Sequence, residues 1–192
     1  MDFVAKRHLP RLEQECYRGL AFVHWTAATD KRAIGWLTPR FHAAWQLALL
    51  HAGSRYDLAC PAYALMPDHF HLLWLGLDEH GSDQRVAIEF LLKHTGPSLE
   101  HAHWQRQPYD KVLREHQRTR DTFVNVAGYI LENPVRAGLV RERGDWPYSG
   151  CCIAGYPRLN VHDAEYWPLF WRLYARLVES RSIRSRSQPR AE

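Results

Sequence analysis

The chain has 192 residues, enough for one domain with a sizeable core, and it carries eight Trp, nine Tyr, seven Phe and a net charge of +4 at pH 7. Residues 180–192 hold four Arg against one Glu, so only +1 of this charge remains for the other 179 residues. The composition therefore excludes a chain that is basic throughout, and any groove for nucleic acid must come from local clustering of cations.

Cysteine usage and hydropathy indicate the compartment. The four cysteines (Cys16, Cys60, Cys151 and Cys152) form no C-x-x-C motif, no signal peptide precedes them, and neighbours such as Cys151 and Cys152 rarely bridge each other. The apolar runs are too short and too interrupted to cross a bilayer. We therefore expect a soluble cytoplasmic protein with reduced thiols and no contact with a membrane.

In the first half of the chain, the patterns predict strand, helix, strand and strand. The predicted elements are a strand over Tyr17–Thr26, a helix over Pro39–Ala52 capped by Gly53, a strand over Tyr56–Leu65 and a further strand from His69. The turn Met66-Pro67-Asp68 joins the last two strands, which we expect to pair as a hairpin.

The second half predicts a helix over Val86–His94 that ends at Gly96-Pro97, and a strand over Tyr109–Arg114. A helix with Asp121 as N-cap follows, and a C-terminal helix spans Glu165–Glu179 before a Ser/Arg tail, residues 180–192, with too little apolar content to fold. The order strand, helix, strand, strand, helix, strand predicts an α+β fold, a ferredoxin-like antiparallel sheet with flanking helices.

The segment His69-Phe70-His71 lies within an apolar run. The two-residue period of a strand directs both imidazoles to one face of the sheet and Phe70 to the other. Two adjacent imidazoles form half of a metal site. A strand with two solvent-facing histidines is the alternative that this motif alone leaves open.

A second motif, Tyr129-Ile-Leu-Glu-Asn133-Pro134-Val-Arg136-Ala-Gly-Leu-Val140, follows apolar residues at helical spacing. Pro134 cannot continue the hydrogen-bond ladder, so we expect the helix to end near Asn133. Tyr129 and Asn133 are four residues apart and share a helix face, which presents a phenol and a carboxamide oxygen together. A half-buried tyrosine and a helix-ending asparagine are the structural alternative.

Together these two motifs resemble the signatures of the single-tyrosine HUH transposases, and most closely the branch of REP-associated tyrosine transposases. Trp104-Gln105 followed by Tyr109-Asp-Lys-Val-Leu-Arg114, and Asp145-Trp-Pro-Tyr-Ser149, also resemble that branch and stand in its order. The resemblance runs from about residue 47 to residue 149. It departs at Asp68, where the family usually has Asn, and it does not cover the predicted helical extension at 163–179. We expect residues 1–179 to form a single domain.

The resemblance implies an enzyme, a transposase that cleaves and rejoins single-stranded DNA folded into imperfect hairpins. Tyr129 would be the nucleophile, and it would form a 5′-phosphotyrosine link and release a 3′-hydroxyl. His69, His71 and the Asn133 oxygen make an N/O ligand set that suits Mg²⁺ or Mn²⁺, and the histidines would also attract Zn²⁺. The metal would polarise the scissile phosphate.

Contacts to DNA are predicted at four cations, Arg136, Lys93, Lys111 and Arg114, of which Arg136 belongs to the tyrosine motif. Trp104 and Tyr109 can stack on bases or pack in the core. Two other classes of function remain open: an idle hairpin-binding descendant of such a transposase, and a metallohydrolase that uses His69, His71 and a bound water. The pattern leaves open whether the protein is a monomer or a homodimer.

Overall fold

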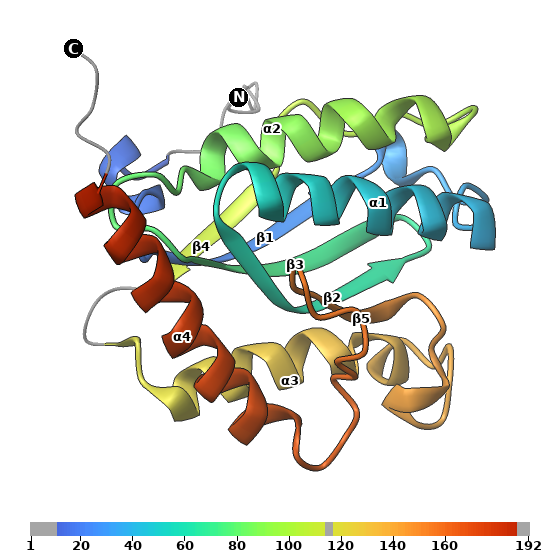
Figure 1. Ribbon diagram of the computed structural model, residues 1–192. Coiled ribbons are helices and arrows are strands. Elements are labelled where there is room, and N and C mark those ends of the chain that lie inside the picture. Colours follow the sequence, from blue (N-terminus) through green and yellow to red (C-terminus); the bar gives the residue numbers. More distant parts are fainter. Residues whose placement is uncertain (1–10, 114–116, 188–192) are drawn as a thin grey trace, which may run out of the picture.

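The computed structural model describes residues 11–113 and 117–187, and in it a five-stranded sheet lies between two layers of helices (Figure 1). The strands are β1 (Phe22–Ala28), β2 (Leu58–Met66), β3 (His69–Gly76), β4 (Tyr109–Leu113) and β5 (Ser149–Cys152). The α-helices are α1 (Pro39–Arg55), α2 (Gln84–Thr95), α3 (Arg120–Arg136) and α4 (Tyr166–Ser187). The described residues also include the short 3-10 turns η1 (Gln14–Tyr17), η2 (Asp30–Arg32), η3 (Gly96–Leu99) and η5 (Arg143–Asp145).

The strands lie in the order β4-β1-β3-β2-β5, and each neighbouring pair is antiparallel. The first four strands in this order form the ferredoxin-like sheet, so the predicted fold class is confirmed. The predicted hairpin of β2 and β3 is also present, and its turn falls at Pro67-Asp68. β5, which follows the Asp145-Trp-Pro-Tyr motif, extends the sheet beyond β2.

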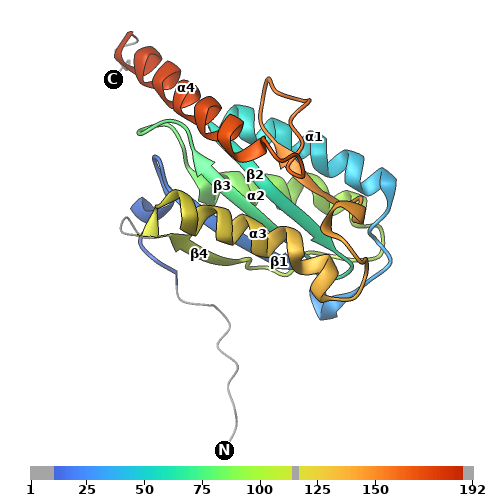
Figure 2. The same cartoon turned by 90° about the horizontal axis from the view of Figure 1, so that it is seen from below.

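Apolar cores lie on both faces of the sheet. One core lies between the sheet and helices α1 and α2, and it includes Trp25, Trp45, Phe70 and Trp74. The other lies beneath α3 and α4 and includes Leu73, Leu75, Phe123, Ile130 and Phe170. Figure 2 shows α3 and α4 crossing this second face side by side.

The central strand β3 serves both cores by alternation. Phe70, Leu72 and Trp74 are fully buried toward α1 and α2, and Leu73 and Leu75 are fully buried toward α3 and α4. His71 therefore lies on the face that α3 covers and is only 7% exposed. The alternative of solvent-facing histidines on an open sheet does not hold for His71.

Helix α3 differs from the prediction at both ends. Its N-cap is Thr119, whose side chain accepts a hydrogen bond from the Thr122 backbone, and not Asp121. It also continues through Pro134 to Arg136. Because a proline has no N–H to donate four residues back, the Ile130 carbonyl loses its partner, and the Asn133 side chain donates to that oxygen (3.4 Å) and to the Tyr129 carbonyl (2.8 Å) instead.

Three further boundaries differ. α1 passes through Gly53, the predicted cap, to Arg55, and the left-handed turn that follows is taken by Asp57 (φ 48°). β1 begins at Phe22 because residues 14–17 form a 3-10 turn. The tail predicted to be disordered from residue 180 is helical up to Ser187, where Arg181 binds the Asp57 carboxylate (Nε–Oδ1 2.9 Å), and residues 188–192 lie outside the described part.

The four cysteines all carry free thiols, in agreement with the prediction. In the described ranges, no helix combines the length and the apolar character needed to cross a membrane.

The crossing of the chain at Gly76 gives a test of the fold. A Cβ built on Gly76 lies 1.7 Å from the Gly19 backbone oxygen, so Gly76→Ala must displace backbone, and we expect a loss of more than about 3 kcal/mol in the free energy of unfolding. Gly128→Ala is the matched control, because nothing lies within 4 Å of its Cβ and alanine favours a helix by about 0.5–1 kcal/mol. Urea denaturation measures both, and equal stabilities would contradict the predicted close approach.

Candidate active site

His69 and His71 converge on the face of the sheet that α3 covers. Their Nε2 atoms are 3.2 Å apart, as expected for residues two apart on one strand. His69 Nδ1–H donates to Asp68 Oδ1 at 2.6 Å, and this bond leaves the lone pair on its Nε2 directed toward His71. A carboxylate behind an imidazole is the usual second partner of a metal-binding histidine.

Asp68 is itself held by Arg32 from a strained loop. Arg32 Nη1 lies 3.1 Å from Asp68 Oδ2, and Lys31 and Arg32 both adopt left-handed backbone conformations (φ 52° and 55°). Partial burial acts to raise the pKa of Asp68, but the hydrogen bond from His69 and the Arg32 charge lower it overall. Thr29 holds the same loop to the strand, since its backbone N–H and its hydroxyl both donate to the Asp68 carbonyl. Two consecutive non-glycine residues with positive φ are costly and indicate a constrained site.

The Nδ1 atom of His71, the ring nitrogen that does not contact His69, has two partners. It lies 3.0 Å from Thr26 Oγ1 and 3.1 Å from His24 Nε2, both on β1. Burial, followed by the neighbouring imidazoles, lowers the pKa of His71 to about 3, and burial and the Lys111 charge lower that of His24 to about 4. Both rings are therefore neutral at pH 7, which is the form that binds metal.

The geometry of the histidine pair fits a divalent cation. Two nitrogens, each about 2.1 Å from one ion, are about 3.0 Å apart at a right angle and about 3.4 Å apart at a tetrahedral angle, and the observed 3.2 Å lies between them. Without an ion, the same distance suits an N–H···N hydrogen bond. Within residues 11–113 and 117–187, no group of three His, Cys, Asp or Glu side chains could hold a metal, so a third protein ligand would need another residue type.

Tyr129 faces the histidines from α3. Its ring centroid is 5.9 Å from that of His71 and 6.2 Å from that of His24, and its side chain is 44% exposed. The Arg136 guanidinium lies over the same ring, 5.0 Å from its centroid. The phenol is thus oriented by a cation two turns further along the helix and remains open to a substrate.

Asn133 lies one turn beyond Tyr129 on the same helix face. Its NH₂ group faces the Tyr129 and Ile130 carbonyls, which can only accept, so Oδ1 is turned away from the helix backbone. The side chain therefore replaces the bond lost at Pro134 and leaves an oxygen available as a ligand.

A cavity of about 480 Å³ opens between α3 and strands β1, β3 and β4, next to the histidines. Its lining comes from β1, β3, β4 and α3: His24, Thr26, His71, Tyr109, Lys111, Thr122, Asn125, Val126 and Tyr129.

The predicted DNA contacts separate into three groups. Lys111 lines the cavity and Arg136 packs on Tyr129, so both belong to the site. Lys93 lies on α2, on the opposite face of the sheet, and is not brought to the site. Arg114 lies outside the described residues. Trp104 packs against Phe70 in the α1–α2 core, whereas the Tyr109 ring is 56% exposed.

Sequence reasoning missed His24, Thr26 and Arg32. Alternation along β1 places His24 and Thr26 on one face, but only the pairing of Thr26 with His71 shows that this face carries the site. No signal in the sequence identifies Arg32, because its role depends on the loop conformation.

The chain is similar to known proteins in sequence and in structure. No protein-family model matches the chain. A Haemophilus influenzae protein named as a REP-associated tyrosine transposase is 28% identical over 149 residues, which cover 68% of this chain and 78% of that protein.

Two solved structures are similar. A REP-associated tyrosine transposase bound to a REP hairpin matches with a TM-score of 0.60 and 22% identity over 74% of this chain and 81% of that one, which shows the shared fold. A Deinococcus radiodurans protein described as a transposase matches less well, with a TM-score of 0.41 and 19% identity over 65% and 97% of the two chains. The chain is thus similar in sequence to a protein named as a REP-associated tyrosine transposase, and it shares the fold of the hairpin-bound transposase.

Proposed function

We propose that this protein is a metal-dependent nuclease and strand transferase that cuts and rejoins single-stranded DNA bearing a hairpin, through a 5′-phosphotyrosine intermediate. The observation that carries the proposal is the convergence of the two Nε2 atoms, 3.2 Å apart, beside the exposed ring of Tyr129. The homologous transposase fold, solved with a REP hairpin, supports the choice of substrate.

The proposed reaction exchanges one phosphate ester for another. The Tyr129 oxygen bonds to phosphorus, the bond from phosphorus to the 3′-oxygen breaks, and the proton lost by the phenol is balanced by the one gained by the 3′-hydroxyl. Reversal by a 3′-hydroxyl rejoins the strand without a nucleotide cofactor. A single attacking tyrosine cuts a single strand, and Tyr129 is the proposed residue because its ring packs beside those of His71 and His24.

Each residue of the candidate site would have its own role in this reaction. His69, His71 and the Asn133 oxygen would hold Mg²⁺ or Mn²⁺, and the ion, when bound, would polarise a phosphate oxygen and neutralise developing charge. Arg136 holds the Tyr129 ring in place, and Lys111 supplies a cation to the phosphate backbone. Asp68 lies on the outer nitrogen of His69 and Thr26 on that of His71, and these contacts would orient the two Nε2 atoms toward the ion.

Replacement of Tyr129 by Phe removes one oxygen and little volume. Folding and hairpin binding should therefore persist, while cleavage falls by about 10³-fold or more and the denaturation-resistant DNA adduct disappears. Gel electrophoresis after denaturation measures cleavage and adduct together, and peptide mass spectrometry locates the linked residue. Tyr148→Phe is the control, because Tyr148 packs on His42 and Trp146, away from the histidine pair.

Two outcomes would contradict the proposed nucleophile. An adduct on Tyr109, which lines the same cavity, would move the role to that residue. Cleavage by the Phe variant without an adduct would favour attack by a metal-bound water. Hairpin binding by the native protein without cleavage would instead identify an idle binding protein.

Loss of one histidine should remove the metal site. We expect His69→Ala or His71→Ala to lower the cleavage rate by about 100-fold or more, since stabilisation by an ion is worth several kcal/mol. EDTA should stop the native enzyme, and Mg²⁺ or Mn²⁺ should restore it. His103→Ala is the matched control, because His103 also stands in a His-x-His segment, is exposed and lies outside the cavity. Full activity in protein that elemental analysis shows to be free of metal would contradict the proposal.

The contribution of Asp68, whose carboxylate orients His69, can be measured separately through metal affinity. Asp68→Ala removes the acceptor behind His69, and we expect Mn²⁺ affinity, measured by calorimetry, to fall by about 10–100-fold. Asp68→Asn keeps an oxygen acceptor and loses only the charge, so it should retain most of the affinity. Equal affinities in all three proteins would show that the 2.6 Å contact has no influence on the histidine pair.

A further inference from the structure

The cavity beside Tyr129 contains three side chains that the proposed reaction does not fully use. Tyr109 and Lys111 come from the edge strand β4, and Asn125 comes from α3, one turn before Tyr129. The backbones of Tyr109 and Lys111 pair with β1, but the side chains of the three residues form no hydrogen bond or ion pair with another described residue. The fold thus presents an aromatic ring, an ammonium group and a carboxamide toward the same space, and none of these groups has a hydrogen-bond or ion-pair partner in residues 11–113 and 117–187. The Lys111 charge also acts on the neighbouring His24 ring.

These three groups match the chemistry of one nucleotide. A half-exposed aromatic ring can stack on a base of any kind, and such stacking is a common source of affinity for single strands. A carboxamide offers one acceptor and two donors to a base edge, as in the pairing of asparagine with adenine. Lys111 is positioned for the attached phosphate, and the apolar side chain of Val126 completes the wall.

The dimensions also match. The cavity, at about 480 Å³, falls in the range of about 300–1,000 Å³ that is typical of small-ligand pockets, so it suits one nucleotide. Asn125 lies about 6 Å along the helix axis from Tyr129. Tyr109 lies two strands from His71, or about 10 Å. A nucleotide held by these residues would therefore stand within about three nucleotides of a phosphate at Tyr129, since neighbouring phosphates of a stacked strand are about 3.4 Å apart along its axis.

We propose that this cavity binds one unpaired base that lies within about three nucleotides of the scissile phosphate, with Tyr109 stacking on the base, Asn125 reading its edge and Lys111 contacting its phosphate. The proposal rests on the proposed function, because it takes the DNA strand cut at Tyr129 as the ligand. It adds a specificity-determining subsite: the base in the cavity selects the position of the cut, whereas the hairpin selects the molecule.

The test uses fluorescence, so that it does not depend on cleavage. A hairpin with single-stranded flanks is first selected by binding from a randomised pool. 2-Aminopurine is then placed at each flank position in turn, and each oligonucleotide is titrated with the Tyr129→Phe protein. We expect quenching at one position within about three nucleotides of the cut made by the native enzyme, and we expect Tyr109→Leu, in the same background, to remove at least half of that quenching.

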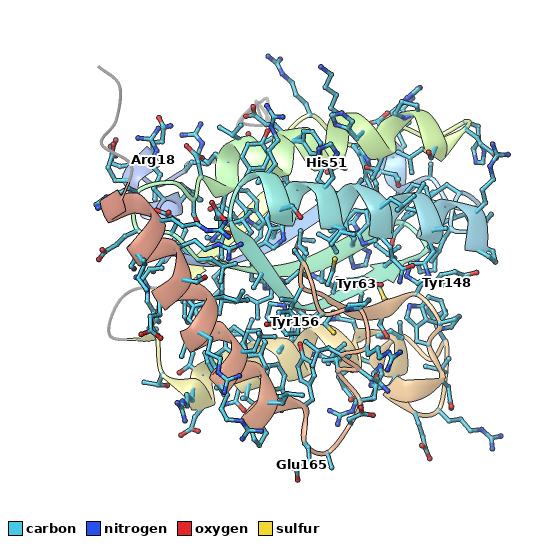
Figure 3. All side chains as sticks on the ribbon, viewed as in Figure 1. Arg18, His51, Tyr63, Tyr148, Tyr156 and Glu165 are labelled. Carbon is cyan, nitrogen blue, oxygen red and sulfur yellow. The ribbon has the colours of Figure 1, made fainter. Side chains whose placement is uncertain are left out.

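A matched control is available at the other edge of the sheet. Tyr156 follows β5 and is 43% exposed, and it lines a separate cavity between α1 and the β5 loop (Figure 3). Tyr156→Leu therefore removes a tyrosine of similar exposure and should leave the quenching pattern unchanged.

Base preference supplies the second readout. When the four natural bases are compared at the quenched position, the native protein should prefer one of them by about tenfold in binding, and Asn125→Ala should reduce this preference to about twofold or less. A residue that only supports the fold would lower affinity for all four bases equally.

The failure of this proposal can be distinguished from the failure of the proposed function. Cleavage and an adduct at Tyr129, with no position whose quenching depends on Tyr109, would overturn the base subsite and leave the nuclease intact. Quenching that depends on Tyr109, with no cleavage by the native protein, would support the subsite in a protein that binds hairpins and does not cut. A preference unchanged in Asn125→Ala would remove Asn125 from the role of reading the base.

Discussion

The alternation of side chains along β3 is the constraint on which the rest of the structure depends. This strand lies between β1 and β2, and its Phe70, Leu72 and Trp74 are fully buried beneath α1 and α2. The opposite side chains must then face α3, and two of them are His69 and His71. Because a slip of one residue in register would exchange the two faces, it would place imidazoles in the core beneath α1 and apolar rings beside Tyr129. The same register of β3 is therefore required both to pack the hydrophobic core and to place the histidine pair on the side of α3.

Helix α3 supplies the other half of the site, and its continuation past Pro134 is what keeps that half in line. A helix that ended at Asn133 would leave the direction of the following residues undetermined. In the structure, Asn133 compensates for the missing proline N–H, and the helix reaches Arg136, which packs on Tyr129. Asn133 therefore has a structural role that does not compete with its proposed role at the metal, because the NH₂ group serves the first and the oxygen is left for the second.

Local patterns were sufficient to predict the ferredoxin-like order, the β2–β3 hairpin and the shared face of His69 and His71, because each depends on periodicity or on turn chemistry. They were not sufficient for groups whose role depends on neighbours distant in sequence. The role of His24 depends on the pairing of β1 with β3, and Lys93, a predicted DNA contact, lies on α2 on the far face of the sheet. The predicted end of α3 near Asn133 was wrong. The rule for proline considers only the backbone, whereas here the Asn133 side chain donates the hydrogen bond that Pro134 cannot make.

Both imidazoles of the pair are oriented from behind, and by different means. The carboxylate of Asp68 holds His69 and is paired with Arg32, in a loop where two consecutive residues have positive φ. His71 is held by neutral groups on a buried strand, Thr26 and His24. A buried second carboxylate would need its own cation, whereas a hydroxyl and an imidazole can be buried at lower cost when they are hydrogen-bonded. The charged partner therefore lies at the rim, where an exposed arginine can reach it, and the neutral partners lie inside. This arrangement orients the two Nε2 atoms toward each other, 3.2 Å apart, and the Tyr129 ring packs beside that of His71.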